Sequence, residues 1–450
     1  MTSDLLTPGY DSPERRSPMI VATFNLIATI VGGSVLSLPL AFARCGLILG
    51  TVLMIFAAVI TDRSLFLLCL CARRTGATSY GEVGKAAFGQ NMEYFISGLL
   101  FVFLVFVLMA YMVLLEDIWT DIVEIVGNRE NVPAQLVLLV IILLMSPFLA
   151  QRTLHALRFN CYVGFASVSI LCLALCHHAF ITPLPDPLLL WTTSWNDVLF
   201  AFPIITLSFL SIFNILPIQG ALLHPSRDRM QGVIGGAVSG SLVLSLVFAI
   251  SGYLYAGSAT NGNILLNCDH HSDWMFFLGR LGCGVTIMLA MAMMLLPCRD
   301  SLLEVLDVLT NHPHIVRVEE EQLLLLSSAR NSDTLPDPLL VMAKRPKLRE
   351  NRWVHYTSTI GIVAICYLSA VRVPGVALVW SLCGSWMAFI IAFILPAACF
   401  LKIQTKYPPS NDDDDRSSSQ AWIVFSWILL LLSLVSAVAC SLQTIMAQLI

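Results

Sequence analysis

Long apolar runs alternate with short polar connections along almost the whole chain. A helix needs about 17 to 25 predominantly apolar residues to cross the hydrocarbon core of a bilayer. Eleven runs reach this length, near 19–43, 47–70, 92–115, 134–150, 158–181, 197–219, 232–257, 274–297, 353–371, 374–401 and 420–446. The pattern predicts an all-α integral membrane protein with eleven transmembrane helices, of which 134–150 is the shortest.

The positive charges test this count independently, because Lys and Arg gather on the cytoplasmic side of membrane proteins. With the N-terminus in the cytosol, twenty of the 25 Lys and Arg residues fall on inner segments. Arg63 lies within a span, and the four on outer segments are Arg44, Arg129, Arg280 and Arg372. A miscounted helix would invert every later connection, so the asymmetry supports eleven spans, a cytosolic N-terminus and a C-terminus outside or in a lumen.

Two of the runs are interrupted at matching places. The first contains the sequence IVGGS at 30–34, followed by Pro39, and the sixth contains SIFN at 211–214, followed by Pro217. Unpaired N–H and C=O groups cost several kcal/mol each in a bilayer, so irregular backbone persists there only where it lines a cavity or is covered by protein. A break at this depth therefore marks a candidate site.

The interrupted runs are the first members of two sets of five spans, 1–5 and 6–10. An odd number of spans in each set makes the repeats inverted, and interrupted helices at corresponding positions point to a binding site near the bilayer midplane. The sequence thus predicts a 5+5 inverted repeat with broken helices 1 and 6, and an eleventh span outside the repeat. This is the architecture of a secondary transporter that works by alternating access.

The ends of the interrupted helices predict the ligand. Exposed N–H groups and a positive dipole end, where the second half of the first span begins, suit a carboxylate. Free carbonyls near 208–211, which end the first half of the sixth span, suit an ammonium. A site with both ends selects an α-amino acid, although small residues at 32–33 can also serve close helix packing. The candidate substrate-binding residues are Gly32, Gly33, Ser34, Val35, Tyr111, Ser208, Ser211, Phe213 and Asn214, with Phe209 and Trp386 as further aromatic walls.

Sequence motifs in a fixed order extend this picture over nearly the whole chain. They include FNLIATIVGGSVLSLPLAFARCG (24–46), TDRSLFLL (61–68), TSYGEVGKAAFG (78–89), AYMVLLED (110–117), SPFLAQRTLHALRF (146–159), GNILLN (262–267), LLPCRDSL (295–302) and GVALVWSLCGSWMAFIIAFILPAACFLK (375–402). In these motifs and their spacing the chain resembles the amino acid/auxin permease family, especially its neutral and vacuolar amino acid transporters. The resemblance implies a leucine-transporter-like fold of eleven helices.

The same resemblance implies coupling to sodium or to protons, and departures from the family pattern favour protons. Sodium-coupled members have an asparagine where Ala28 stands and a threonine near 288–290, and this chain has neither. Asp62 is the only acidic residue that lies well inside one of the apolar runs of the sequence. Ionisable residues within the membrane are usually functional, so Asp62 is the candidate for proton coupling. The alternative is that Asp62 and Arg63 form a polar pair at the cytosolic end of the span.

Composition limits the remaining classes of function. The chain is 57% hydrophobic and 12% charged with a net charge of −4, which argues against nucleic acid as a partner. Most of the 13 cysteines lie in apolar runs; Cys45 and Cys268, near outer connections, could be bridged or simply buried. No cofactor or metal is expected, and the histidines of the segment 269–273 are interpreted as a solvated loop.

The functional prediction is a secondary active transporter of amino acids, neutral ones in particular, that is proton-coupled or otherwise independent of sodium. Two alternatives stay open: a sodium-coupled symporter, and an amino-acid-sensing receptor that keeps the fold. A membrane enzyme is excluded because no nucleophile, base and orienting group occur together and no phosphate-binding loop is present. The expected location is a vacuolar, lysosomal or other internal membrane, or the plasma membrane.

The sequence divides into four predicted parts. Residues 1–18 are expected to be a short disordered cytosolic tail, and 19–401 the transporter core. Within that core, 298–352 is a cytosolic loop whose acidic start and leucine run could form a surface helix. Residues 402–419 are expected to be an acidic cytosolic loop, followed at 420–450 by the eleventh span and a short outer C-terminus.

Overall fold

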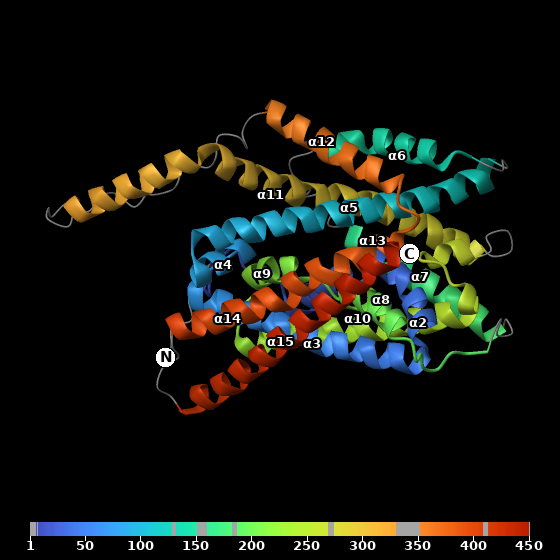
Figure 1. The fold of residues 1–450 in the computed structure, drawn as a ribbon, viewed down its shortest axis with the longest axis horizontal. Coiled ribbons are helices and arrows are strands. Elements are labelled where there is room, and N and C mark those ends of the chain that lie inside the picture. The colour runs from blue at the N-terminus through green and yellow to red at the C-terminus, as the bar shows by residue number, and fades with distance from the viewer. Residues whose placement is uncertain are drawn as a thin grey trace.

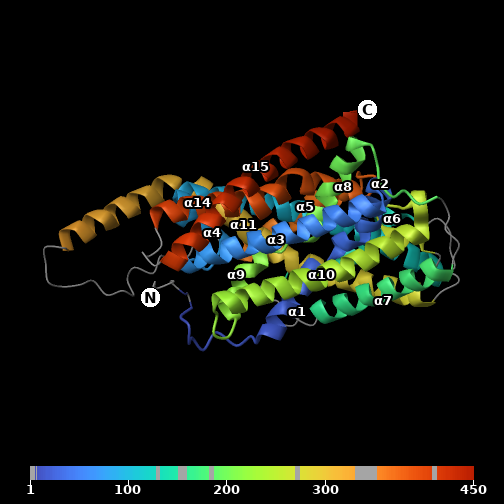
Figure 2. The same cartoon turned by 90° about the horizontal axis from the view of Figure 1, so that it is seen from below.

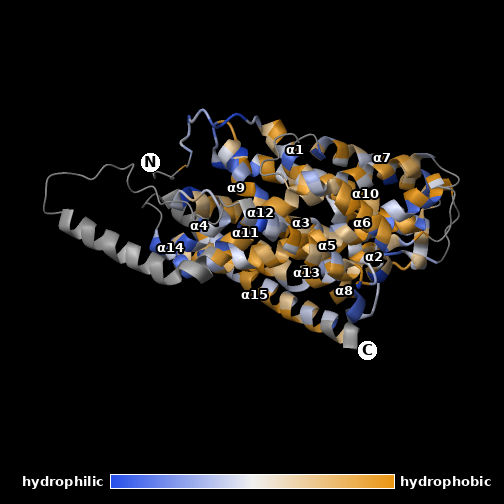
Figure 3. Cartoon of the chain, turned by 90° about the horizontal axis from the view of Figure 1, so that it is seen from above, coloured by the Kyte–Doolittle hydropathy of each residue, from blue (hydrophilic) through white to orange (hydrophobic). Residues whose placement is uncertain are grey.

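The computed structural model describes residues 6, 8–127, 132–150, 160–181, 187–268, 274–329, 352–407 and 413–449. Over these ranges the protein is helical without strands, and its one β-bridge joins Ser17 to Leu222. The helices run side by side along the length of an elongated bundle, with the two termini toward opposite ends (Figure 1). Hydrophobic residues cover most of the bundle, and hydrophilic residues gather toward its ends (Figure 3).

The helices follow the apolar runs of the sequence in order. Their bounds are α1 Met19–Ile30, α2 Leu38–Cys45, α3 Leu47–Thr75, α4 Tyr80–Phe88, α5 Gln90–Gly127, α6 Ala134–Leu149, α7 Asn160–Ile181, α8 Trp195–Ser208, α9 Ile212–Ala221, α10 Arg227–Ala256, α11 Trp274–Ala329, α12 Arg352–Ala370, α13 Val376–Cys383, α14 Leu395–Lys406 and α15 Asp413–Leu449. Two π-helical turns, 384–388 and 390–394, join α13 to α14.

Within the described ranges, nine helical segments are long and apolar enough to cross a membrane, and α1 with the segment Gly33–Cys45 makes a tenth. The remaining predicted span, near 134–150, is α6, which has only 16 residues. At 1.5 Å per residue it is about 24 Å long, somewhat less than the roughly 30 Å of hydrocarbon core. Figure 1 shows α6 and α12 at one edge of the bundle.

Both predicted interruptions are present. Helix α1 ends at Ile30, the short 3₁₀ helix η1 (Gly33–Ser37) follows, and the two halves of the span are bent by 45°. In the sixth span α8 ends at Ser208 and α9 begins at Ile212, but the two halves remain aligned enough to form one 27-residue span. The first interruption is therefore the more strongly bent.

Local chemistry explains how the first span resumes after its break. Pro39 occupies the first turn of α2. Backbone N–H groups in a first turn have no acceptor within the helix, so a proline there costs no hydrogen bond. Its ring lies against Gly252 of α10, where an added Cβ would approach Pro39 Cγ to 2.5 Å. The second half of the span thus packs directly on α10, while α1 packs on both α10 and α7 (Figure 2).

The prediction of a disordered N-terminal tail is wrong for residues 8–18, which we call the N-terminal clasp. Arg15 is only 4% exposed, and its guanidinium donates to the carbonyl oxygens of Pro8, Gly9, Gln219, Gly220 and Leu222. The amides of residues 16 and 17 both donate to Ala221 O. The last carbonyls of a helix lack intrahelical partners and attract cations, so Arg15 fits the end of α9.

Other helix boundaries also differ from prediction. Helix α11 does not end near 297 but continues to Ala329 and projects beyond the bundle (Figure 1). Pro297 and Pro313 both lie within it and do not end it. Residues 330–351 lie outside the described part of the chain. Helix α15 begins at Asp413, within the expected acidic loop. Arg280, assigned to an outer segment, is buried in α11 and paired with Asp121 of α5.

Candidate functional site

Two cavities meet at the break in the first span. The larger has a volume of about 120 Å³ and lies among the first span, α5, α7, α9 and α11. The smaller has a volume of about 50 Å³ and lies among the first span, α5, the sixth span and α13. Both are lined by Thr29, Gly32, Gly33, Tyr111 and Met294.

The backbone at the first break presents the start of a new helix to these cavities. The last hydrogen bond of the α1 ladder joins Val31 N–H to Ile27 O, and Gly32 then adopts an extended conformation with φ −109° and ψ −163°. The ladder resumes where Val35 N–H donates to Gly32 O. The amides of residues 33 and 34 lie between these two bonds, at the positive end of the second half-helix.

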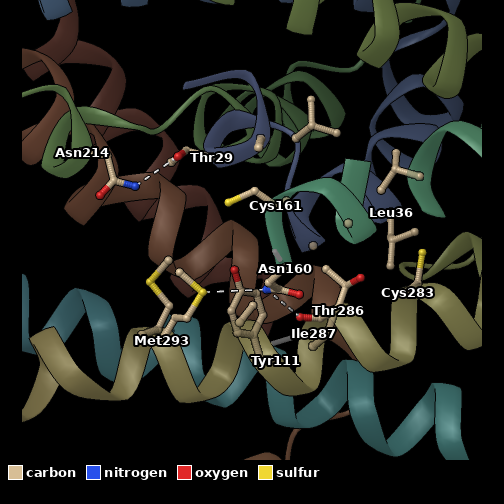
Figure 4. Close-up of a pocket in the computed structure, with 18 residues that line it drawn as sticks. Thr29, Leu36, Tyr111, Asn160, Cys161, Asn214, Cys283, Thr286, Ile287 and Met293 are labelled. Atoms are coloured by element: carbon tan, nitrogen blue, oxygen red, sulfur yellow. Dashed lines mark hydrogen bonds between the residues drawn. The ribbon is translucent and has the colours of Figure 1, made fainter. Parts of the chain in front are cut away.

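A hydrogen bond connects the two interrupted spans. Asn214 Nδ2 donates to Thr29 Oγ1 over 3.1 Å (Figure 4). Thr29 Oγ1 itself donates to Asn25 O over 2.9 Å. Two carbonyl oxygens at the sixth-span break already accept hydrogen bonds. Ser211 O accepts from the backbone N–H of Asn214, and Phe209 O accepts from the Ser211 hydroxyl. Fewer free carbonyls face the cavities than the sequence suggested.

Aromatic side chains form part of the walls. Tyr111 lies over the break, and Phe213 lines the smaller cavity together with Trp380, whose ring meets Tyr111 edge-on at 6.3 Å. Phe209 is fully buried outside both cavities, and Trp386, 39% exposed, lines neither. The expectation that these two are walls is therefore wrong, and Trp380, six residues before Trp386, takes that position.

Most of the predicted binding residues come together here. Seven of the nine line one or both cavities: Gly32, Gly33, Ser34, Tyr111, Ser208, Phe213 and Asn214. Val35 and Ser211 are buried nearby but line neither cavity. They pack behind the broken backbone and do not form the surface that a ligand would touch.

Sequence reasoning missed several polar residues of the larger cavity. Thr29, Asn160 and Thr286 all line it, as does Ala28 of the first span (Figure 4). Thr286 lies two residues before 288–290, where the family pattern has a threonine. Asn160 begins α7 directly after a polar connection, so hydropathy alone assigns it to a helix end rather than to a binding surface.

Asp62 lies away from both cavities. It lines a separate groove of about 410 Å³ between α3 and α10, together with Arg63 and Gln231. Its carboxylate Oδ2 is 3.5 Å from Arg63 Nε, so the two neighbours form an ion pair. The geometry gives Asp62 no direct contact with a molecule bound at the helix breaks.

The cysteines form no disulfide. All 13 are free, and Cys45 and Cys268, the pair for which a bridge was considered, are both buried. Burial raises the pKa of the Cys268 thiol to about 12. The histidines of segment 269–273 lie outside the described residues.

Comparison with known proteins gives the same picture at the level of the whole chain. The family model of transmembrane amino acid transporter proteins matches residues 15–446. Vacuolar amino acid transporter 7 of Saccharomyces cerevisiae is 27% identical over 303 residues, which cover 64% of this chain and 59% of that protein. Solute carrier family 38 member 10 of Homo sapiens is 23% identical over 394 residues, 84% of this chain and 32% of that protein.

A plant relative matches over a greater share of both chains. Amino acid transporter AVT6E of Arabidopsis thaliana is 23% identical over 444 residues, 95% of this chain and 83% of that protein. The chain therefore spans most of the plant relative but less than two thirds of the yeast and human proteins.

Solved structures agree on the fold. A Na⁺-coupled sialic acid symporter in a substrate-bound, outward-open state aligns with a TM-score of 0.50 at 13% identity, over 99% of this chain and 92% of that one. A nucleobase-cation-symport-1 family transporter in a closed conformation aligns with a TM-score of 0.51 at 12% identity, over 100% and 95%. The predicted leucine-transporter-like fold is confirmed at this level.

Proposed function

Because the chain belongs to the transmembrane amino acid transporter family, we propose that it is a secondary active transporter that carries neutral amino acids across a membrane by alternating access. The observation that carries the proposal is the broken first span. Its second half begins at Gly33, which lines both cavities, and at Ser34, which lines the smaller one. Such a helix start stabilises a carboxylate without a cationic side chain.

The lining of the cavities supports a neutral substrate. Among the described residues, neither cavity is lined by an acidic, a basic or a histidine side chain. A charged substrate side chain would lose its hydration there without gaining a partner of opposite charge. Threonine, sulfur-containing and aliphatic side chains suit small polar or apolar substrates better.

Transport coupled to protons, or independent of sodium, is the mode that the residues favour. Ala28 brings a methyl group to the larger cavity where an oxygen ligand for sodium would be needed. Thr286 supplies a hydroxyl there and donates its proton to Gly282 O over 2.8 Å, which leaves its oxygen free to accept, but sodium needs several oxygen ligands. Asp62, in its groove between α3 and α10, remains the proposed proton carrier, and it would act on transport through the movement of these helices.

The proposed topology has eleven spans with α6 as the fourth, a 5+5 inverted repeat formed by spans 1–10, and a cytosolic N-terminus. The segments 298–352 and 402–419 then face the cytosol, and the end of α15 faces the outside or a lumen. The membrane is an internal one, vacuolar or lysosomal in type, or the plasma membrane. The name of the yeast relative, a vacuolar amino acid transporter, supports an internal membrane.

Uptake into proteoliposomes tests the function directly. The full-length protein would be offered a panel of radiolabelled neutral, acidic and basic amino acids, with sodium and pH gradients imposed separately. We expect uptake of neutral amino acids that a pH gradient changes and a sodium gradient does not. Binding without uptake would instead indicate a receptor, and sodium-dependent uptake would indicate the sodium-coupled alternative.

Substitution of Asp62 by Asn tests the coupling residue in the same assay. We expect uptake to continue in the absence of a gradient but to lose its response to a pH gradient, because the amide cannot carry a proton at neutral pH. Arg63→Gln, which removes only the ion-pair partner, serves as the control. An unchanged pH response in Asp62→Asn would remove Asp62 from the proposal.

A further inference from the structure

We propose that Asn160 recognises the ammonium group of the transported amino acid through its side-chain oxygen. This inference rests on the proposed function and identifies a binding residue that the sequence patterns did not indicate. It assigns the positive end of the substrate to the larger cavity, at the start of α7, rather than to the carbonyls of the sixth span.

The orientation of the Asn160 amide is fixed by its neighbours. The side chain is 6% exposed, and its Nδ2 donates to Thr286 O at 3.4 Å and lies 3.8 Å from Met293 Sδ (Figure 4). Reversing the amide would place the oxygen against a carbonyl oxygen and a sulfur, which donate nothing. The oxygen is therefore held away from α11.

The side-chain oxygen of Asn160 has no partner. It is buried, and no described residue donates to it. Buried polar atoms in native proteins are nearly always hydrogen-bonded, and an unpaired acceptor costs stability. Because Asn160 lines the larger cavity, a molecule bound there can supply the missing donor.

The surroundings of this oxygen favour an ammonium over a metal cation. Hard metal ions need several oxygen ligands, whereas most of the nearby lining is sulfur and methyl, as at Cys161, Cys283 and Met293. An ammonium has three N–H donors and is satisfied by a few acceptors. Thr286 Oγ1 gives its own proton to Gly282 O and so keeps its lone pairs for a second bond.

The same cavity also contains Gly33, where the second half of the first span begins. A zwitterion bound there has acceptors for its ammonium at α7 and amides for its carboxylate at the first span. The carbonyls proposed from the sequence are less available, since those of Phe209 and Ser211 already accept hydrogen bonds. Asn160 is the buried acceptor in this cavity that is left without a donor.

The test compares Asn160→Leu with wild type and with Cys161→Ala, a control that changes the same cavity without removing a fixed acceptor. The probes are a transported amino acid from the uptake panel and its des-amino carboxylic acid as a competitor. In Asn160→Leu we expect the KM of the amino acid to rise roughly tenfold to a hundredfold. The inhibition constant of the des-amino acid should change less than about threefold, since it has no ammonium to lose.

Asn160→Asp keeps an acceptor at the same place but loses the N–H group that donates to Thr286 O, so we expect the KM of the amino acid to rise less than the inhibition constant of the des-amino acid. This variant also decides the matter if the leucine variant does not fold, because a KM that weakens as much as that inhibition constant, or more, would overturn the proposal. Equal weakening of amino acid and des-amino acid would overturn it too, since that result indicates a merely structural role. An unchanged KM in Asn160→Leu would overturn the proposal as well, because the ammonium would then not need this oxygen.

The outcomes separate the two levels of inference. Wild-type protein that takes up no amino acid would overturn the proposed function, and this assignment with it. If the wild type takes up amino acids and Asn160→Leu still prefers the amino acid over its des-amino acid as strongly as the wild type does, only the assignment of Asn160 is overturned.

Discussion

Gly32 and Gly33 look alike in the sequence, but their surroundings differ. A Cβ on Gly33 would lie 3.1 Å from Leu114 Cδ1 and 3.2 Å from Tyr111 Cε1, closer than almost all real contacts of this kind. A Cβ on Gly32 would meet its nearest atoms at 3.8 and 3.9 Å, which is ordinary packing. The requirement for glycine therefore rests on Gly33 and on its contact with Tyr111.

This difference gives a matched pair of variants. Gly33→Ala should displace the Tyr111 ring and the start of the second half-helix, so we expect uptake to fall at least roughly tenfold. Gly32→Ala, whose extended backbone any residue can adopt, should stay within about threefold of wild type. Initial rates in proteoliposomes, normalised to folded protein, measure both. Equal rates in the two variants would contradict the proposed carboxylate position.

Cys268 allows a prediction about pH. Burial raises the pKa of its thiol to about 12, and the residue is only 2% exposed. A thiol with a raised pKa stays protonated until the pH approaches that value, and only the thiolate reacts rapidly. We expect no maleimide labelling of Cys268 between pH 7 and about pH 9 in folded protein, and full labelling after denaturation. Mass spectrometry would detect both states, and an oxidised pair with Cys45 would contradict the structure.

At the scale of elements, hydropathy predicted which segments are helices but not how their ends are held. The breaks at 30–34 and 211–214 were recognisable because glycine, serine and proline are rare together at that depth. The clasp was not, because the burial of Arg15 depends on Gln219 and Gly220, which lie more than 200 residues away in sequence. Trp380 and Asn160 were missed for the same reason: their positions depend on contacts between helices.

The clasp predicts different effects for neighbouring arginines. Arg15→Ala should leave several carbonyls at the end of α9 without a donor and cost roughly 2 to 4 kcal/mol. Arg16→Ala should have little effect, since its side chain is exposed and donates to Pro13 O at the surface. Thermal unfolding in detergent would show a midpoint lower by about 5 °C for the first variant alone. Equal midpoints would indicate that the clasp does not contribute to stability.

The contact between α2 and α10 gives a second prediction at this scale. Gly252→Ala would force its Cβ toward the Pro39 ring, and we expect a loss of roughly 1 to 3 kcal/mol from overpacking. Gly361→Ala in α12, where nothing lies within 4 Å of an added Cβ, is the control and should be neutral or slightly stabilising. Thermal midpoints compare the two, and equal shifts would contradict the close packing.

For the whole molecule, the open question of eleven spans or ten depends on α6. The distribution of positive charge predicts that the termini lie on opposite sides of the membrane, and the bundle places them toward opposite ends (Figures 1 and 2). The fold itself was predictable, since apolar run lengths and the paired breaks define it. The length of α6 was also predictable, since the apolar run 134–150 nearly coincides with the helix Ala134–Leu149. Hydropathy does not predict whether so short a helix crosses the membrane.

Tags at the two termini test the topology. In sealed vesicles we expect protease to remove one tag and leave the other protected until detergent is added, because an odd number of spans separates the ends. If α6 lay along the membrane without crossing it, ten spans would remain and both tags would respond alike. Selective permeabilisation of cells identifies which end faces the cytosol.

The N-terminal clasp has a consequence for the working cycle. The proposed alternating-access cycle requires contacts at one side of the bundle to break and re-form repeatedly. Arg15 holds the end of α9 through main-chain oxygens, and water can replace each of those bonds at little net cost once the segment lifts. Opening the clasp would therefore cost less than removing the Arg15 side chain, which leaves the same oxygens buried without a donor.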